Sequence, residues 1–171
     1  MRPLSLLLII VCVLTLTREI NAQQTAPPPR SVPGAKDFDF WVGEWNLSWG
    51  DTSRGTNTVS FTLDSAVVME QFSGGSSTPL RGMSVSAYNQ RSKRWQQTWV
   101  DNGGDYLDFS GAFTNGKMIL SRKAELNGKE FLQRMVWFAI SHDSLNWHWD
   151  RSDDNGTTWK TLWAIHYERR R

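Results

Sequence analysis

The chain has 171 residues, with 19 lysine and arginine residues against 17 acidic ones, and a formal net charge of +2 at neutral pH. So small a net charge argues against capture of nucleic acid or of an anionic membrane surface. The length suits one folded domain, and the single cysteine, Cys12, rules out an internal disulfide framework.

The first 22 residues are predicted to be a signal peptide. Arg2 supplies a positive charge, residues 4–16 form a largely apolar run, and Ala22 offers a small residue for cleavage. The run of 13 residues is too short to span a membrane, because a spanning helix needs roughly 20. We therefore expect a secreted or periplasmic protein that starts near Gln23, carries no thiol and does not associate with the membrane after cleavage.

A proline-rich linker is predicted over residues 23–34, because its four prolines fit neither a β-ladder nor the interior of a helix. The folded domain is predicted over residues 35–171. A short helix is expected over residues 35–42, ahead of the first strand.

The rest of the domain is predicted to be all β, because polar and apolar residues alternate and turn signals recur about every 13 residues in the C-terminal half. These signals are four Asn-Gly pairs, at residues 102, 115, 127 and 155, and the polar segment 141–144. In the last segment the alternation predicts one shared face for Trp159, Thr161, Trp163, Ile165 and Tyr167. The ten predicted strands span residues 44–50, 56–64, 67–73, 81–89, 94–101, 105–114, 117–125, 129–141, 144–153 and 158–169.

Ten strands joined by short turns favour an antiparallel up-and-down β-barrel, in which each strand pairs with the next and the last pairs with the first. The alternative is a sandwich with Greek-key crossings, for which the uniformly short turns leave no long connections. The pattern Ser152-x-Asp154-x-Gly156-x-Thr158 matches the Asp-box of sialidases, and a single copy predicts a polar turn held by side-chain hydrogen bonds to the backbone.

Gly43-x-Trp45 at the start of the first strand resembles the motif of the calycin superfamily, the lipocalins and their relatives. In those barrels the tryptophan plugs one end and a late arginine packs over it, which implies this role for Arg169 or Arg170. The wider pattern includes FDFWVGEW at residues 38–45, the Trp95-x-x-x-Trp99 pair and the late SDDNGTTW segment. It resembles a domain-of-unknown-function family of small exported bacterial proteins with a lipocalin-like barrel, and the resemblance implies no activity.

The ten tryptophans allow two interpretations. Each can bury roughly 200 Å², so they can fill a solid core. Alternatively, they line a cavity for a flat or apolar ligand.

Two charged residues interrupt apolar stripes of the predicted strands. Glu70 lies between Val68 and Phe72 on its face, and Arg134 shares a face with Val136. An isolated charge in a barrel lumen costs several kcal/mol, so we hypothesise that both point inward and either pair or bracket a polar group of a ligand. The candidate ligand-binding residues are Glu70, Ser84, Gln97, Trp99, Arg134, Trp137 and His166.

These features favour a non-catalytic barrel that binds a small, partly apolar molecule in its lumen. One alternative is a haem-binding sensor or enzyme with His166 as the iron ligand. Another is a solid barrel that binds a partner protein through its outer surface. No catalytic residue, metal site or resident cofactor is predicted, and the oligomeric state is left open.

Overall fold

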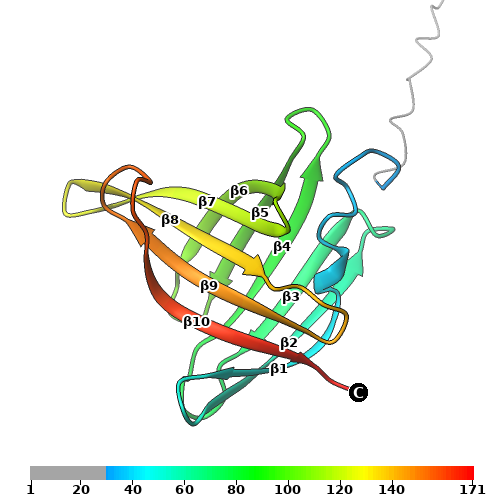
Figure 1. Ribbon diagram of the computed structural model, residues 1–171, viewed down its shortest axis with the longest axis horizontal. Coiled ribbons are helices and arrows are strands. Elements are labelled where there is room, and N and C mark those ends of the chain that lie inside the picture. The colour runs from blue at the N-terminus through cyan, green and yellow to red at the C-terminus, as the bar shows by residue number, and fades with distance from the viewer. Residues whose placement is uncertain (1–29) are drawn as a thin grey trace, which may run out of the picture.

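The computed structural model describes residues 30–171, which form a closed antiparallel barrel of ten strands (Figure 1). The predicted signal peptide, with Cys12, and most of the predicted linker lie outside the described residues. Within residues 30–171, no helix is long and apolar enough to cross a membrane.

A single turn of 3₁₀ helix, η1 (Asp39–Trp41), precedes the strands. The strands are β1 (Gly43–Trp49), β2 (Ser53–Thr62), β3 (Val67–Ser73), β4 (Arg81–Asn89), β5 (Arg94–Asp101), β6 (Tyr106–Thr114), β7 (Lys117–Leu126), β8 (Lys129–Phe138), β9 (Ser144–Ser152) and β10 (Lys160–Arg169).

Each strand pairs with the next in sequence, and β1 closes the barrel against β10. The predicted up-and-down barrel is confirmed, and the Greek-key sandwich is excluded. The helix predicted over residues 35–42 is shorter than expected. Backbone hydrogen bonds over this stretch join residues three apart, from Ala35 to Val32 and from Asp37 to Gly34, so it forms successive tight turns rather than an α-helix.

Two of the four Asn-Gly sites form the expected two-residue hairpin turns. Asn115-Gly116 and Asn127-Gly128 have positive φ at both positions, as a type I′ turn requires. Asn155-Gly156 also has positive φ but lies in the longer loop between β9 and β10. At Asn102-Gly103 the positive φ falls one residue later, on Gly104, within the four-residue β5–β6 connection.

The inner and outer walls of the barrel follow the strand alternation except in β10. The register shifts between Thr161 and Trp163, which face Asp150 and Trp149 of β9 respectively, so Leu162 is an extra residue. This bulge corrects the predicted single face of the last strand. Thr161 bonds Asp150 on the outer wall, whereas Trp163 joins the inner wall.

One end of the barrel, here called the closed end, is filled by η1 and aromatic rings. Trp45 is fully buried, and its indole N–H donates to the carbonyl oxygen of Trp41 at 2.8 Å. Phe38 stacks on Trp41 at 4.9 Å between ring centroids and meets Trp95 and Trp137 edge-on. The core is therefore concentrated at the end where the chain enters.

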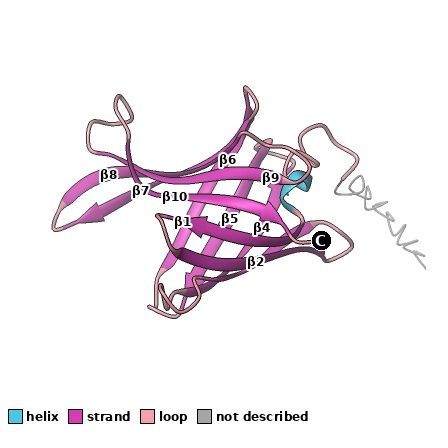
Figure 2. Cartoon of the chain, turned by 60° about the horizontal axis from the view of Figure 1, so that its bottom comes forward, coloured by secondary structure: helices cyan, strands magenta, loops and turns pink. Residues whose placement is uncertain are grey.

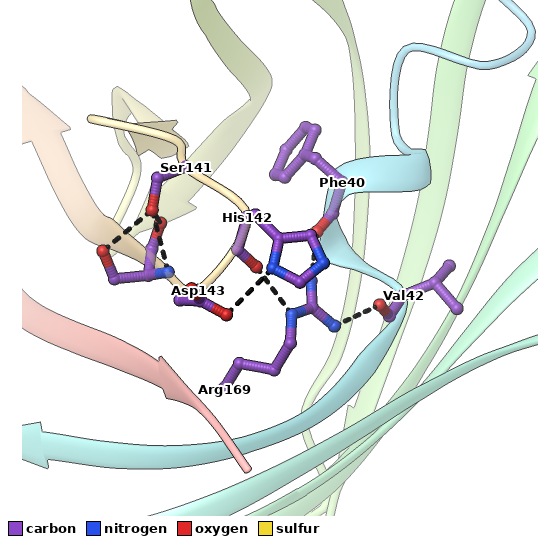
Figure 3. Close-up of polar contacts among 7 residues, drawn as sticks. Phe40, Val42, Ser141, His142, Asp143 and Arg169 are labelled. Carbon is purple, nitrogen blue, oxygen red and sulfur yellow. Dashed lines mark hydrogen bonds and ion pairs between the residues drawn. The ribbon is translucent and has the colours of Figure 1, made fainter. Parts of the chain in front are cut away.

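Arg169 seals this end, in the place that the resemblance implied (Figure 3). Its guanidinium lies 4.1 Å from the Trp45 ring and donates to the carbonyl oxygens of His142, Val42 and Phe40 at 2.7, 2.9 and 3.2 Å. Gly43 has a φ of 145°, and any Cβ there would overlap Arg169. The Gly-x-Trp motif thus makes room for the arginine.

The other end, here called the open end, has a split wall. The β6–β7 ladder joins only Ser110–Thr114 to Lys117–Ser121. Toward the open end, β6 pairs only with β5 and β7 only with β8. Figure 2 shows the β7–β8 hairpin projecting beyond the neighbouring strands. The split leaves β6 and β7 without backbone pairing along this part of the wall.

Candidate functional site

A cavity of about 460 Å³, here called the lumen cavity, occupies the open half of the barrel. Its wall comes from seven strands and is mostly aromatic and apolar. The lining residues used below are Glu70, Phe72, Trp99, Asp101, Asp105, Arg122, Ala124, Glu125, Gln133, Trp137, Trp147, Trp149, Trp163 and Tyr167. This volume is large enough for a small organic molecule.

The aromatic rings of the cavity form a connected frame. Trp163 meets Trp49, Phe72 and Trp147 edge-on, with ring centroids 5.3 to 5.9 Å apart. Trp147 also stacks on Trp149 at 6.5 Å. Because each ring is held by another, the frame presents flat faces of fixed orientation to the cavity.

A buried carboxyl group lies within this aromatic frame. Glu70, on β3, is 5% exposed and accepts hydrogen bonds from Asn57 Nδ2 and Ser84 Oγ, both at 2.7 Å. Asn57 Nδ2 also donates to the Tyr167 hydroxyl at 3.3 Å. Asn57, Glu70 and Ser84 stand on the neighbouring strands β2, β3 and β4, whereas Tyr167 stands on β10, which β1 separates from β2, so closure of the barrel assembles the network.

The electrostatics of the network are dominated by burial. Burial raises the pKa of Glu70 from its ordinary value to about 7, although hydrogen bonds from Ser84 and Asn57 act in the opposite direction. Burial, and then the charge of Glu70, also raises the pKa of Tyr167 well above its ordinary range. Glu70 can therefore hold or release a proton near neutral pH, while Tyr167 stays a neutral hydroxyl.

The open end adds further charges. Although burial alone would raise it, hydrogen bonds from Trp99 and from the backbone of the β5–β6 loop lower the pKa of Asp101. Asp105 and Glu125 are exposed at the same mouth. Arg122 is the one cationic side chain among the described cavity residues, and it donates to Gln133 Oε1 at 2.8 Å. Its Nε is buried without a partner.

Five of the seven sequence-predicted site residues lie on the inner wall. Glu70, Ser84 and Trp99 cluster around the cavity, as expected. Trp137 reaches the cavity from the closed end, and its buried indole N–H has no partner. Gln97 also faces inward, but it donates to Ser86 at 2.9 Å and borders a separate hollow at the split in the wall.

Arg134 is on the outer wall, which corrects its predicted inward orientation and both predicted alternatives, a pair with Glu70 and a ligand group bracketed by the two. It bonds Asp150 Oδ2 at 2.9 Å, and its guanidinium stacks on Trp159 at 3.9 Å. The β9–β10 loop folds over this face, held by the predicted turn in which Ser152 and Asp154 bond the loop backbone. The loop therefore covers the outward-facing apolar residues of β8 that share a face with Arg134. In the sequence, these covered residues form the same pattern as residues that face the lumen.

His166 also faces outward, where it is exposed and bonds Asn146 at 2.8 Å. Its neighbours Ile165 and Tyr167 take the inner positions. In the part of the chain that the structure describes, no histidine lines the lumen cavity and no acidic or histidine cluster is arranged to hold a metal. The position of His166 gives no support to haem ligation in the lumen.

Sequence reasoning missed Asn57, Tyr167 and Arg122. The criterion that selected Glu70 could have found two of them, because Asn57 shares a stripe with Val59, and Arg122 shares one with Leu120. Tyr167 gave no such signal, since a tyrosine among apolar residues fits a core position equally well.

No family model and no curated protein matches this sequence.

Proposed function

We propose that the protein binds a small, partly apolar molecule in the lumen cavity without transforming it. The observation that carries this proposal is the cavity itself, a space of about 460 Å³ framed by tryptophans around one buried carboxyl group. In the alternative of a solid barrel, the tryptophan rings would have filled the volume that the lumen cavity occupies. Mostly apolar walls with a few fixed polar groups are typical of small-molecule sites.

Access to the cavity supports the same proposal. Exposed residues of the open end, Asp105 and Glu125, are part of its lining. The split between β6 and β7 offers a way in.

Entry can be tested with N-phenyl-1-naphthylamine, a neutral dye that brightens in apolar sites. Ala124 lines the cavity near its mouth, so Ala124→Trp should fill the space and abolish the increase in fluorescence. Ala164 is exposed on the outer wall, so Ala164→Trp is the matched control and should bind the dye normally. Equal binding by both variants would contradict lumen binding.

We also propose, from the N-terminal sequence alone, that the protein acts outside the cytoplasm. Native mass spectrometry of protein purified from its own host would address both points. The intact mass reports whether the chain begins near Gln23, and any co-purifying mass identifies the ligand.

A further inference from the structure

We propose that the lumen cavity selects an organic cation, an amine with an aromatic or apolar body, whose ammonium group pairs with Glu70. This inference rests on the proposed lumen binding and names its ligand class. Three independent features of the cavity carry it: the position of Glu70, the aromatic faces around it, and the charges at the mouth.

Glu70 is placed to receive a cation. Each carboxylate oxygen accepts one hydrogen bond from the protein, from Asn57 and from Ser84. Because each oxygen has two lone pairs, both keep capacity for a further donor. No cationic side chain pairs with Glu70 within residues 30–171, since Arg134 is on the outer wall with Asp150. A ligand ammonium would supply the missing counter-charge.

The walls suit a cation as well. Phe72, Trp99 and Trp163 line the same cavity as Glu70, and the ring centroid of Phe72 is 5.9 Å from that of Trp99 and 5.8 Å from that of Trp163. Ring faces attract ammonium groups, and the attraction grows when the site excludes water. The same rings would bury the apolar body of an arylalkylamine.

The mouth has an excess of negative charge. Among the described residues that line the cavity, four have carboxyl groups, and only Arg122 has a cationic side chain. The four are Glu70, Asp101, Asp105 and Glu125. A nearby rim cation, Arg151, is paired with Asp153 at 2.7 Å. Charge lining a cleft with low-dielectric walls concentrates ions of the opposite sign. An anionic ligand drawn by Arg122 is the competing possibility, but it would meet the field of Glu70.

The experiment compares three ligands with one indole body by calorimetry: tryptamine, which is cationic, tryptophol, which is neutral, and indole-3-acetate, which is anionic. At pH 8 we expect tryptamine to bind at least about tenfold tighter than tryptophol, and indole-3-acetate to bind most weakly, as one charge pair in a buried site allows. The amine stays protonated throughout, so its affinity should rise about tenfold from pH 6 to pH 8 as Glu70 ionises.

The groups facing Glu70 are Asn57, Ser84 and Tyr167, and the charged groups of the lining are Asp101, Asp105, Glu125 and Arg122. Burial places the pKa of Glu70 within the pH range of this experiment. Glu70→Gln should therefore remove both the tryptamine preference and its pH dependence, while tryptophol affinity changes less than about twofold. Glu168→Gln, exposed on the outer wall of β10 and outside the cavity lining, is the matched control and should keep both.

The outcomes separate the two proposals. If tryptophol matches tryptamine, or if indole-3-acetate binds best, the cation inference is overturned while lumen binding stands. If the preference survives Glu70→Gln, the cation inference is also overturned. If none of the three ligands binds and the neutral dye is excluded too, the proposed function itself fails. The ligand series and the pH dependence use the unaltered protein, so they decide the matter even if a variant folds poorly.

Discussion

The two ends of this barrel use the same residue type for different purposes. At the closed end, Trp41, Trp45 and Trp95 are at most 2% exposed and pack against η1 under the Arg169 seal. At the open end, Trp99 and Trp163 are only partly buried and frame the lumen cavity. The role of a tryptophan in this barrel therefore depends on whether another element fills the space that its ring faces.

The comparison predicts unequal costs of removing a tryptophan. Trp45→Ala should lower the free energy of unfolding by about 3–5 kcal/mol, because it opens a hole in a fully packed end and leaves Arg169 without its ring. Trp99→Ala should cost about 1–2 kcal/mol, because that ring already borders open space. Urea denaturation midpoints measure both, and equal losses would remove the distinction between the ends.

The second prediction is that Glu70, at the open end, makes the stability of the protein depend on pH. Because burial raises the pKa of Glu70 from 4.5 to about 7, the folded state binds one proton more than the unfolded state between these values. Stability should therefore be greatest below about pH 4.5, fall by about 3 kcal/mol up to pH 7, and level off above it. This describes the contribution of Glu70 alone.

Glu70→Gln isolates that contribution, since the amide stays neutral and can keep the bond from Asn57. The difference in unfolding free energy between the two proteins, measured from pH 4.5 to pH 8, should move in favour of the variant as the pH rises. A difference that stays constant with pH would mean that Glu70 is solvated in the folded protein. The closed end has no fully buried carboxyl group among its described residues, so Trp45→Ala, which removes no titratable group, should leave the pH profile unchanged.

The fold was predictable from the sequence because its signals are local. Asn-Gly turns and alternation fixed the strands to within about three residues, and most positions agree with the structure. The inner face was harder to predict, because three features act beyond the local pattern. The bulge at Leu162 moves Thr161 to the outer wall, and the β9–β10 loop covers an apolar stripe of β8. Closure against β10 brings Tyr167 to Asn57, a partner of Glu70.

Glu70 and Arg134 show this limit directly. Both interrupt apolar stripes, and the sequence does not distinguish a stripe facing the lumen from one covered by a loop. In the structure, Glu70 faces the cavity, whereas Arg134 pairs with Asp150 beneath Trp159. The nature of the site, a carboxyl group with no cationic partner, depends on this difference.

The prediction with the smallest expected effect concerns the placement of Glu70 in the lumen and Arg134 on the outer wall. Double-mutant cycles test this placement. Arg134 is 26% exposed and Asp150 only 4%, so their pair lies between a solvated surface bridge and a buried one. We expect a coupling energy of about 1 kcal/mol between Arg134→Met and Asp150→Asn, since residues in contact couple by about 0.5–3 kcal/mol. Glu70→Gln with Arg134→Met should be additive within about 0.5 kcal/mol, because the barrel wall separates the two side chains. Urea midpoints of the single and double variants give both energies from one set of measurements. Strong coupling of Glu70 to Arg134 would place the arginine in the lumen, and the cavity would then hold its own counter-ion rather than select one from solution.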